Sequence, residues 1–182
     1  MTPARRGGTR RVRSATPPLR VRRARLADAA ALAAVMRAAI RGVPRGTYPG
    51  RTLAAWASLP ALYHAWAMTA GGETILVAEL GGRIAGYGGL RGSEVTALFV
   101  PPAAARQGVA SALLARIEAL ARRRGVTRLR VDAAMSGTSF YRARGFTGRR
   151  SVKVPLPGGS LAAVRMTKAL TEASSRRPGS PR

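Results

Sequence analysis

Apolar and polar residues follow two periods along this chain. A period of two, or a short run that is apolar on both sides, predicts a strand, and a period near 3.6 predicts a helix. The strand pattern falls at residues 19–23, 74–80, 83–90, 94–100, 129–133, 151–155 and 163–169. The helix pattern falls at residues 28–41, twice within 48–70, from 109 to about 124, and at 138–144.

Local signals indicate how these elements connect. Gly81 and Gly82 stand between two strand patterns, as in a tight hairpin whose turn needs positive φ. Pro49 and Pro60 each suit the start of a short helix. Residues 94–100 are apolar on both sides, which predicts a central strand. The order β, helices, β-β-β, α, β, α, β, β therefore predicts an α/β (α+β) fold with a mixed, mostly antiparallel central sheet flanked by helices.

The length of 182 residues suits one domain. Residues 1–18 are rich in Arg, Gly, Thr and Pro and nearly lack large apolar side chains, so we expect a disordered basic tail. Residues 171–182 have a similar composition, and we expect a second disordered tail there. The single folded domain is therefore predicted at residues 19–170.

The formal net charge is +25, and all but two of the 32 basic residues are arginine. The positive charges are dispersed, and Arg, Ala, Gly and Pro are abundant throughout, as expected from a general compositional bias. We therefore expect attraction to anionic ligands and no specific nucleic-acid partner.

The chain has no cysteine and one histidine, His64, so no disulfide and no metal site is predicted. No apolar run approaches the ~20 residues that span a bilayer, and no signal-peptide core follows the basic start. No membrane partner is expected, and the cytoplasm is the expected location.

The strand at 94–100 leads into a loop with Arg106, Gln107 and Gly108, and this loop opens the helix that carries Ala110 and Ser111. A helix N-terminus presents unpaired backbone N–H groups and a partial positive charge. Small residues allow a ligand to approach the backbone closely, and Arg106 adds a full charge. The segment therefore predicts a site for a phosphorylated cofactor.

Two pieces of this segment, Leu98-Phe-Val-Pro-Pro102 and Arg106-Gln-Gly-Val-Ala-Ser111, resemble the acetyl-CoA motif of the GCN5-related N-acetyltransferase (GNAT) superfamily. Residues 124–146, ending in Phe140-Tyr-Arg-Ala-Arg-Gly-Phe146, resemble the next motif of that family. Residues 76–90 resemble the hairpin that precedes its cofactor strand. The three motifs occur in the family's order and spacing, so the chain is identified as a member with the acyl-CoA N-acyltransferase fold.

The resemblance implies acetyl-CoA as the acetyl donor and no metal. It implies that backbone groups of Leu98 and Val100 pair with the pantetheine arm, and that the strands part beyond this point to admit the thioester. Ala105 departs from the Arg or Gln that begins the family's loop motif, which weakens one contact. The implied cofactor-binding residues are Leu98, Phe99, Val100, Arg106, Gln107, Gly108, Val109, Ala110 and Ser111.

The resemblance also implies catalytic groups. Tyr141 occupies the position of a general acid that protonates the departing thiolate; the alternative is a Tyr that only packs beneath the cofactor. Glu94 lies where the family often has a carboxylate base; the alternative is a surface residue that offsets Arg91. Ala134 replaces an Asn that contacts the cofactor in many relatives.

Other residues have two interpretations. Asp132, between Arg128 and Arg130, is expected to be solvated or ion-paired. His64 is expected to be a helix-face residue and not a base. The aromatic residues Trp56, Tyr63 and Trp66 either belong to the core or line the acceptor pocket.

We therefore predict an N-acetyltransferase that moves acetyl from acetyl-CoA to a primary amine, with a small molecule as the preferred acceptor. The absence of cysteine favours direct attack in a ternary complex. The alternatives are a protein N-terminal or lysine acetyltransferase, and a non-catalytic acyl-CoA-binding module whose basic tail binds nucleic acid. The sequence does not fix the oligomeric state and leaves a homodimer open.

Overall fold

The computed structural model describes residues 18–170, so the expectations for both tails lie outside the described residues. The helices are α1 (Ala29–Arg41), α2 (Gly50–Ala57), α3 (Ala61–Met68), α4 (Val109–Arg123) and α5 (Thr138–Arg142), with single 3₁₀ turns at Leu26–Asp28, Pro102–Ala104 and Met135–Gly137. The strands are β1 (Leu19–Arg23), β2 (Thr74–Leu80), β3 (Arg83–Arg91), β4 (Glu94–Phe99), β5 (Arg128–Ala134), β6 (Thr147–Leu156) and β7 (Gly159–Ala169).

The seven strands form one sheet in the order β1-β2-β3-β4-β5-β7-β6. Every neighbouring pair is antiparallel except β4 and β5, which are parallel. The predicted fold class is confirmed, and β4 has the central position that its two apolar sides predict. The turn between β2 and β3 has the expected positive φ values, 56° at Gly81 and 79° at Gly82.

The last two strands are longer than the sequence pattern predicts. β6 is an edge strand that pairs only with β7, and its first five residues are exposed. The exposed residues at the start of β6, such as Arg149 and Arg150, do not alternate between apolar and polar side chains. The sequence pattern therefore predicts only the second half of the strand.

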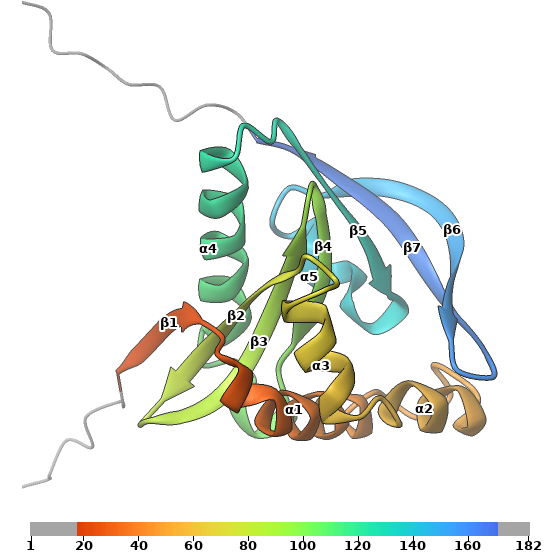
Figure 1. The fold of residues 1–182 in the computed structure, drawn as a ribbon. Helices are drawn as coiled ribbons and strands as arrows, with labels where there is room; N and C mark the ends of the chain where they lie inside the picture. The colour runs from red at the N-terminus through yellow and green to blue at the C-terminus, as the bar shows by residue number, and fades with distance from the viewer. Residues whose placement is uncertain (1–17, 171–182) are drawn as a thin grey trace, which may run out of the picture.

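The sheet is covered on both faces (Figure 1). On one face, α4 packs against the strands with Leu113, Ile117 and Ala121, and the buried Tyr141 and Phe146 belong to the same core. On the other face, α1 and α3 pack over Tyr87 and Val77. The predicted amphipathic helices therefore each find a sheet face.

The parallel strands β4 and β5 stay together only at their first residues. Their register contains two pairs, Glu94 with Arg130 and Val95 with Val131. Beyond Val95 the two strands diverge (Figure 1). The edge of β4 that faces β5 therefore has no strand partner from Thr96 onward.

Candidate active site

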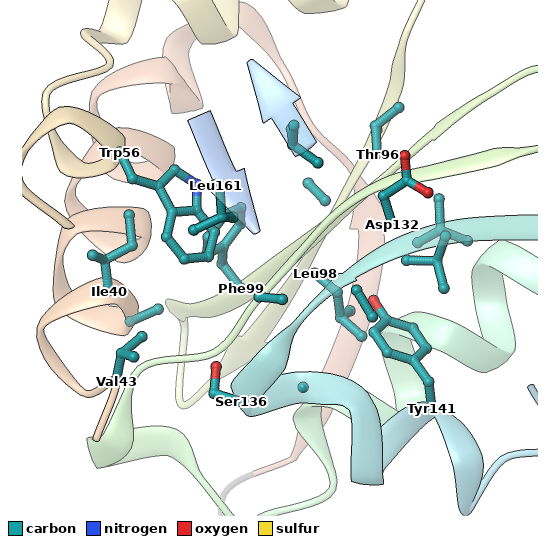
Figure 2. A pocket seen from close by; sticks show the side chains of 18 of the residues that line it. Ile40, Val43, Trp56, Thr96, Leu98, Phe99, Asp132, Ser136, Tyr141 and Leu161 are labelled. Atoms are coloured by element: carbon teal, nitrogen blue, oxygen red, sulfur yellow. The ribbon is translucent and has the colours of Figure 1, made fainter. Parts of the chain in front are cut away.

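A cavity of about 240 Å³ opens where β4 and β5 part; we call it the central cavity (Figure 2). Helices from both faces of the sheet contribute to its walls. Its lining includes Ala39, Ile40, Val43, Trp56, Val95, Thr96, Ala97, Leu98, Phe99, Val100, Val131, Asp132, Ala133, Ala134, Ser136, Gly137, Tyr141, Val154 and Leu161. Most of these side chains are apolar, so the few polar groups determine what chemistry the cavity can support.

Tyr141 projects from α5 into the central cavity, and Figure 2 shows its hydroxyl directed toward the gap beside Leu98. The residue is 6% exposed. Phe140 and Phe146 pack edge-on against its ring, with centroids at 5.4 and 5.3 Å. Burial raises the pKa of Tyr141, so the hydroxyl stays protonated at neutral pH. The site thus presents a phenol proton inside a largely apolar space.

A second hollow lies at the N-terminus of α4; we call it the α4 hollow. Arg106 and Gly108 both adopt left-handed backbone conformations, with φ of 62° and 79°. The hydrogen bond from Ala112 N to Gly108 O, of 2.9 Å, is the first of the helix, so the preceding N–H groups have no intrahelical acceptor. A Cβ at Gly108 would meet only Leu19 Cδ2, at 3.9 Å, so the space above the helix end is open. Such an end can bind a phosphate group.

Arg144 lines the α4 hollow and was not predicted as a site residue. Its guanidinium lies 4.0 Å from the centre of the Phe140 ring and donates a hydrogen bond to Ser111 Oγ. These two contacts hold a positive charge beside the open N–H groups of α4. In a chain with so many arginines, its position three residues after Tyr141 was the only sequence signal.

The two hollows adjoin, since Val100 lines both. A phosphate group at α4 and an acyl group beside Tyr141 would therefore be connected along the unpaired edge of β4. This arrangement fits an extended molecule with an anionic end.

Comparison with known proteins agrees with this geometry. The family described as "Acetyltransferase (GNAT) domain" matches residues 46–170. A crystal structure of a GCN5-related N-acetyltransferase from Rhodopseudomonas palustris is 32% identical, with a TM-score of 0.77 over 86% of this chain and 97% of that chain. This chain belongs to the GNAT acetyltransferase family.

Two more distant structures share the GNAT fold and carry a ligand. The PaiA N-acetyltransferase from Thermoplasma acidophilum, in complex with coenzyme A, is 18% identical, with a TM-score of 0.67 over 84% of this chain and 99% of that chain. YncA from Salmonella typhimurium, with its cofactor acetyl-CoA, is 23% identical, with a TM-score of 0.58 over 88% of this chain and 99% of that chain. These two GNAT structures hold coenzyme A and acetyl-CoA, the cofactor that the resemblance implies for this chain. A comparison with curated protein sequences finds no match.

All the predicted cofactor residues of this GNAT protein except Gln107 line one of the two hollows. Leu98 and Val100 pack toward the core on the α4 face. Phe99 packs on the opposite face, 5.6 Å from Trp56 between ring centroids, and also lines the central cavity. The α4 hollow is lined by Val100, Arg106, Gly108, Val109, Ala110 and Ser111.

Two of these residues have side chains engaged elsewhere. Gln107 Nε2 donates to Ala103 O over 3.0 Å, within its own loop. The Val109 side chain is buried in the α4 core. Any contact of these two residues with a cofactor phosphate would therefore come mainly from their backbone N–H groups.

Glu94 lies at the start of β4 and does not line the central cavity. Its Oε2 is 2.7 Å from Arg130 Nη2 and 4.0 Å from Arg91 Nη2. This position supports the alternative in which Glu94 offsets neighbouring arginines, with Arg130 as the nearer partner. Its role as a base stays a prediction.

Asp132 lines the cavity, but its carboxylate is engaged. Arg165 donates to both oxygens, from Nε over 2.7 Å and from Nη2 over 2.8 Å. This bidentate pair holds the pKa of Asp132 below its ordinary value, so the group is a weak base. The expectation of an ion-paired Asp132 is met.

His64 is 2% exposed, and among the described residues its Nε2 is the one buried side-chain polar atom without a hydrogen-bond partner. It packs edge-on against Tyr87 in the core of the α1 and α3 face. Burial, and then the charge of Arg37, lowers its pKa. The residue is therefore a neutral core histidine outside the cavity.

The three candidate aromatic residues have different places. Trp56 lines the central cavity. Tyr63 and Trp66 are 42% and 50% exposed on α3 and do not line it. Only Trp56 therefore has the position expected of an acceptor-pocket residue.

Glu73 was not predicted as a site residue. It directly precedes β2, is 9% exposed, and accepts a hydrogen bond from the hydroxyl of Thr96 in the cavity wall. Burial raises its pKa. In sequence it follows Gly71 and Gly72, where the pattern indicates only the end of a helix.

Within residues 18–170, no group of three or more His, Asp or Glu side chains is placed to bind a metal ion. No helix in that range is both long and apolar enough to cross a membrane.

Proposed function

We propose that this GNAT protein is an N-acetyltransferase that moves the acetyl group of acetyl-CoA to the primary amine of a small molecule, by direct attack in a ternary complex. The observation that supports this most is the parting of β4 and β5. It opens a cavity beside the buried Tyr141 hydroxyl and adjoins the open N-terminus of α4.

The residues at the α4 hollow fit the anionic end of coenzyme A. Backbone N–H groups from Gly108 to Ser111 would bind the diphosphate, and Arg106 and Arg144 would add positive charge. The extended pantetheine arm would form hydrogen bonds with the unpaired edge of β4, in the way that an additional strand would. Acetyl-CoA supplies an activated acyl group as a thioester.

Tyr141 would act as the general acid. Its raised pKa keeps the proton on Oη in the resting site, and the departing sulfur would take that proton as negative charge develops on it. Leu98, Val131 and Ala133 line the same cavity with apolar side chains that offer this proton no acceptor. The chain has no cysteine that could carry the acetyl group, so the amine would attack directly.

The acceptor side of the cavity indicates the class of amine. Ile40, Val43, Trp56 and Leu161 form an apolar wall, and the cavity volume of about 240 Å³ suits a compact group. The one carboxylate in the lining, Asp132, is neutralised by Arg165. A polycationic acceptor would need several free carboxylates, so the cavity favours a monoamine with an apolar body.

The test is release of thiol from acetyl-CoA with a panel of acceptors: aromatic and branched aliphatic monoamines, polyamines, aminoglycosides, and peptides with free N-termini or lysines. We expect the apolar monoamines to give the largest kcat/KM. Turnover with peptides alone would show a protein acetyltransferase instead. Calorimetric binding of coenzyme A without turnover of any acceptor would show a non-catalytic binding module.

A further inference from the structure

We propose that the Thr96 hydroxyl takes the proton that the acceptor amine loses, and that Glu73 positions this hydroxyl and receives its proton. The inference rests on the proposed function, because it assigns the base of the same reaction. It also replaces Glu94 in that role with a pair of residues that the sequence pattern does not connect.

Thr96 lies where the strands begin to part. The register of β3 and β4 skips it, since Gly89 faces Ala97 and Leu90 faces Val95. The register of β4 and β5 ends one residue earlier, at Val95. Thr96 is therefore a bulge residue without a strand partner on either side, and its side chain lines the central cavity (Figure 2). Bulges commonly redirect a side chain in this way.

Glu73 reaches Thr96 because Gly89 has no side chain. A Cβ at Gly89 would collide with Glu73 Oε1 and with Thr96 Oγ1. The glycine thus leaves room for a carboxylate to lie on the sheet, and Thr96 donates its hydrogen bond to Glu73 Oε1 there.

The direction of this bond matters for function. A threonine hydroxyl has one hydrogen and two lone pairs. Because its hydrogen is directed to Glu73, Thr96 Oγ1 can only accept a hydrogen bond from a group in the cavity. The wall therefore presents an acceptor for an amine N–H, backed by a buried carboxylate.

The surroundings favour proton uptake by Glu73. Burial raises its pKa most; the charge of Glu94 raises it further, and Thr96 and the charge of Arg91 lower it. The other groups that face it are phenols, Tyr63 from α3 and Tyr87 from β3, which stay neutral. Asp132 is held by Arg165, so Glu73 is the stronger base of the two.

The protons balance along this path. As the nitrogen bonds to the acyl carbon, it gives one proton to Thr96 Oγ1, and Thr96 gives its own hydroxyl proton to Glu73 Oε1. The electron pair of the broken C–S bond leaves on sulfur, which takes a proton from Tyr141 Oη. Glu73 then loses its proton to solvent, and Tyr141 regains one.

The test compares Thr96→Val, Thr96→Ser and Glu73→Gln with wild type, using the best monoamine and saturating acetyl-CoA. We expect Thr96→Val and Glu73→Gln to lower kcat about 100-fold, the scale of a lost general base, and to abolish the fall of kcat at acid pH. Thr96→Ser keeps the hydroxyl and should stay within about threefold of wild type. Glu79→Gln on β2, a partly buried carboxylate that is paired with Arg22 and lies outside both hollows, is the control and should leave the pH profile unchanged.

A second readout does not need turnover. Since burial raises the pKa of Glu73, carboxyl NMR should show Glu73 titrating at a higher pH than an exposed Glu. Since the hydrogen bond from Thr96 lowers that pKa, Glu73 should titrate at a still higher pH in Thr96→Val. Burial of the charged Glu73 carboxylate lowers the free energy of unfolding at neutral and higher pH. At pH 8 the denaturant midpoint of Glu73→Gln should therefore equal or exceed that of wild type.

The outcomes separate the two proposals. If Glu73→Gln keeps the rate and the pH profile of an active wild type, or if Glu73 titrates normally, the role of Thr96 and Glu73 is refuted while the acetyltransferase stands. If wild type transfers acetyl to no amine, the proposed function fails, and this inference fails with it.

Discussion

At the scale of single residues, the protonation state of Tyr141 follows from its surroundings. A phenol enclosed by Phe140, Phe146 and the apolar cavity wall stays neutral, because burial penalises the phenolate. The hydroxyl therefore carries its proton at neutral pH.

Removal of that hydroxyl should affect chemistry and not binding. We predict that Tyr141→Phe lowers kcat for thiol release by about 100-fold, as for a lost general acid. The calorimetric affinity for coenzyme A should change less than twofold, because the ring packing remains. Equal kcat values for the variant and wild type would show that Tyr141 only packs beneath the cofactor.

His64 gives a prediction about stability. Its pKa is lower in the folded protein than in the unfolded chain, where it is about 6.5. Below pH 6.5 the unfolded chain therefore binds a proton that the folded protein resists, and the free energy of unfolding falls as the pH drops toward 5. His64→Leu should reduce this loss in urea titrations at pH 7, 6 and 5. An unchanged pH dependence in the variant would contradict a buried neutral histidine.

Residue roles were the least predictable part of the site. Glu73 and Thr96 are 23 positions apart, and their contact depends on a bulge and on the space above Gly89. No local pattern encodes either feature. Arg144 lies inside a recognised motif, but only its contacts in the structure, the stacking on Phe140 and the hydrogen bond to Ser111, distinguish it from the other arginines.

At the scale of elements, the entry into α4 contributes most to the proposed cofactor site. Gly108 combines a left-handed backbone with open space above the helix end. We predict that Gly108→Glu weakens coenzyme A binding more than 100-fold, because the side chain blocks the N–H groups and repels phosphate. Isothermal calorimetry measures this directly.

Gly158 offers a matched control. It lies in the turn between β6 and β7, with φ of 70° and open space, outside both hollows. Gly158→Glu introduces the same charge and the same backbone strain and should bind coenzyme A as wild type does. Similar losses in both variants would mean that Gly108→Glu acts through folding.

Elements were predictable where the sequence carries a local signal, such as an alternation of apolar and polar residues, an apolar run or a proline at a helix start. β1 and β2 have the expected bounds, and the two short helices begin after Pro49 and Pro60. The exposed first half of β6 shows no such signal and was not predicted. The order of elements predicts the mixed sheet. The family resemblance places the parting of the strands beyond Leu98 and Val100, whereas the register of β4 and β5 ends earlier, at Val95.

At the scale of the whole molecule, the net charge of +25 should act on every anionic ligand. We predict that raising NaCl from about 0.05 to 0.5 M weakens coenzyme A binding roughly three- to tenfold, since the Debye length shortens. The KM of a monoamine acceptor should not rise in parallel. Affinity for coenzyme A that is independent of salt would show that only local contacts matter.

On this proposal, one molecule of acetyl-CoA occupies both hollows, with its diphosphate on α4 and its acyl end beside Tyr141. A crystal structure of the protein with acetyl-CoA tests it most directly. We expect diphosphate oxygens within hydrogen-bond distance of the N–H groups between Gly108 and Ser111, and the thioester between β4 and β5. A nucleotide bound elsewhere, with the end of α4 covered by the protein's own side chains, would contradict it.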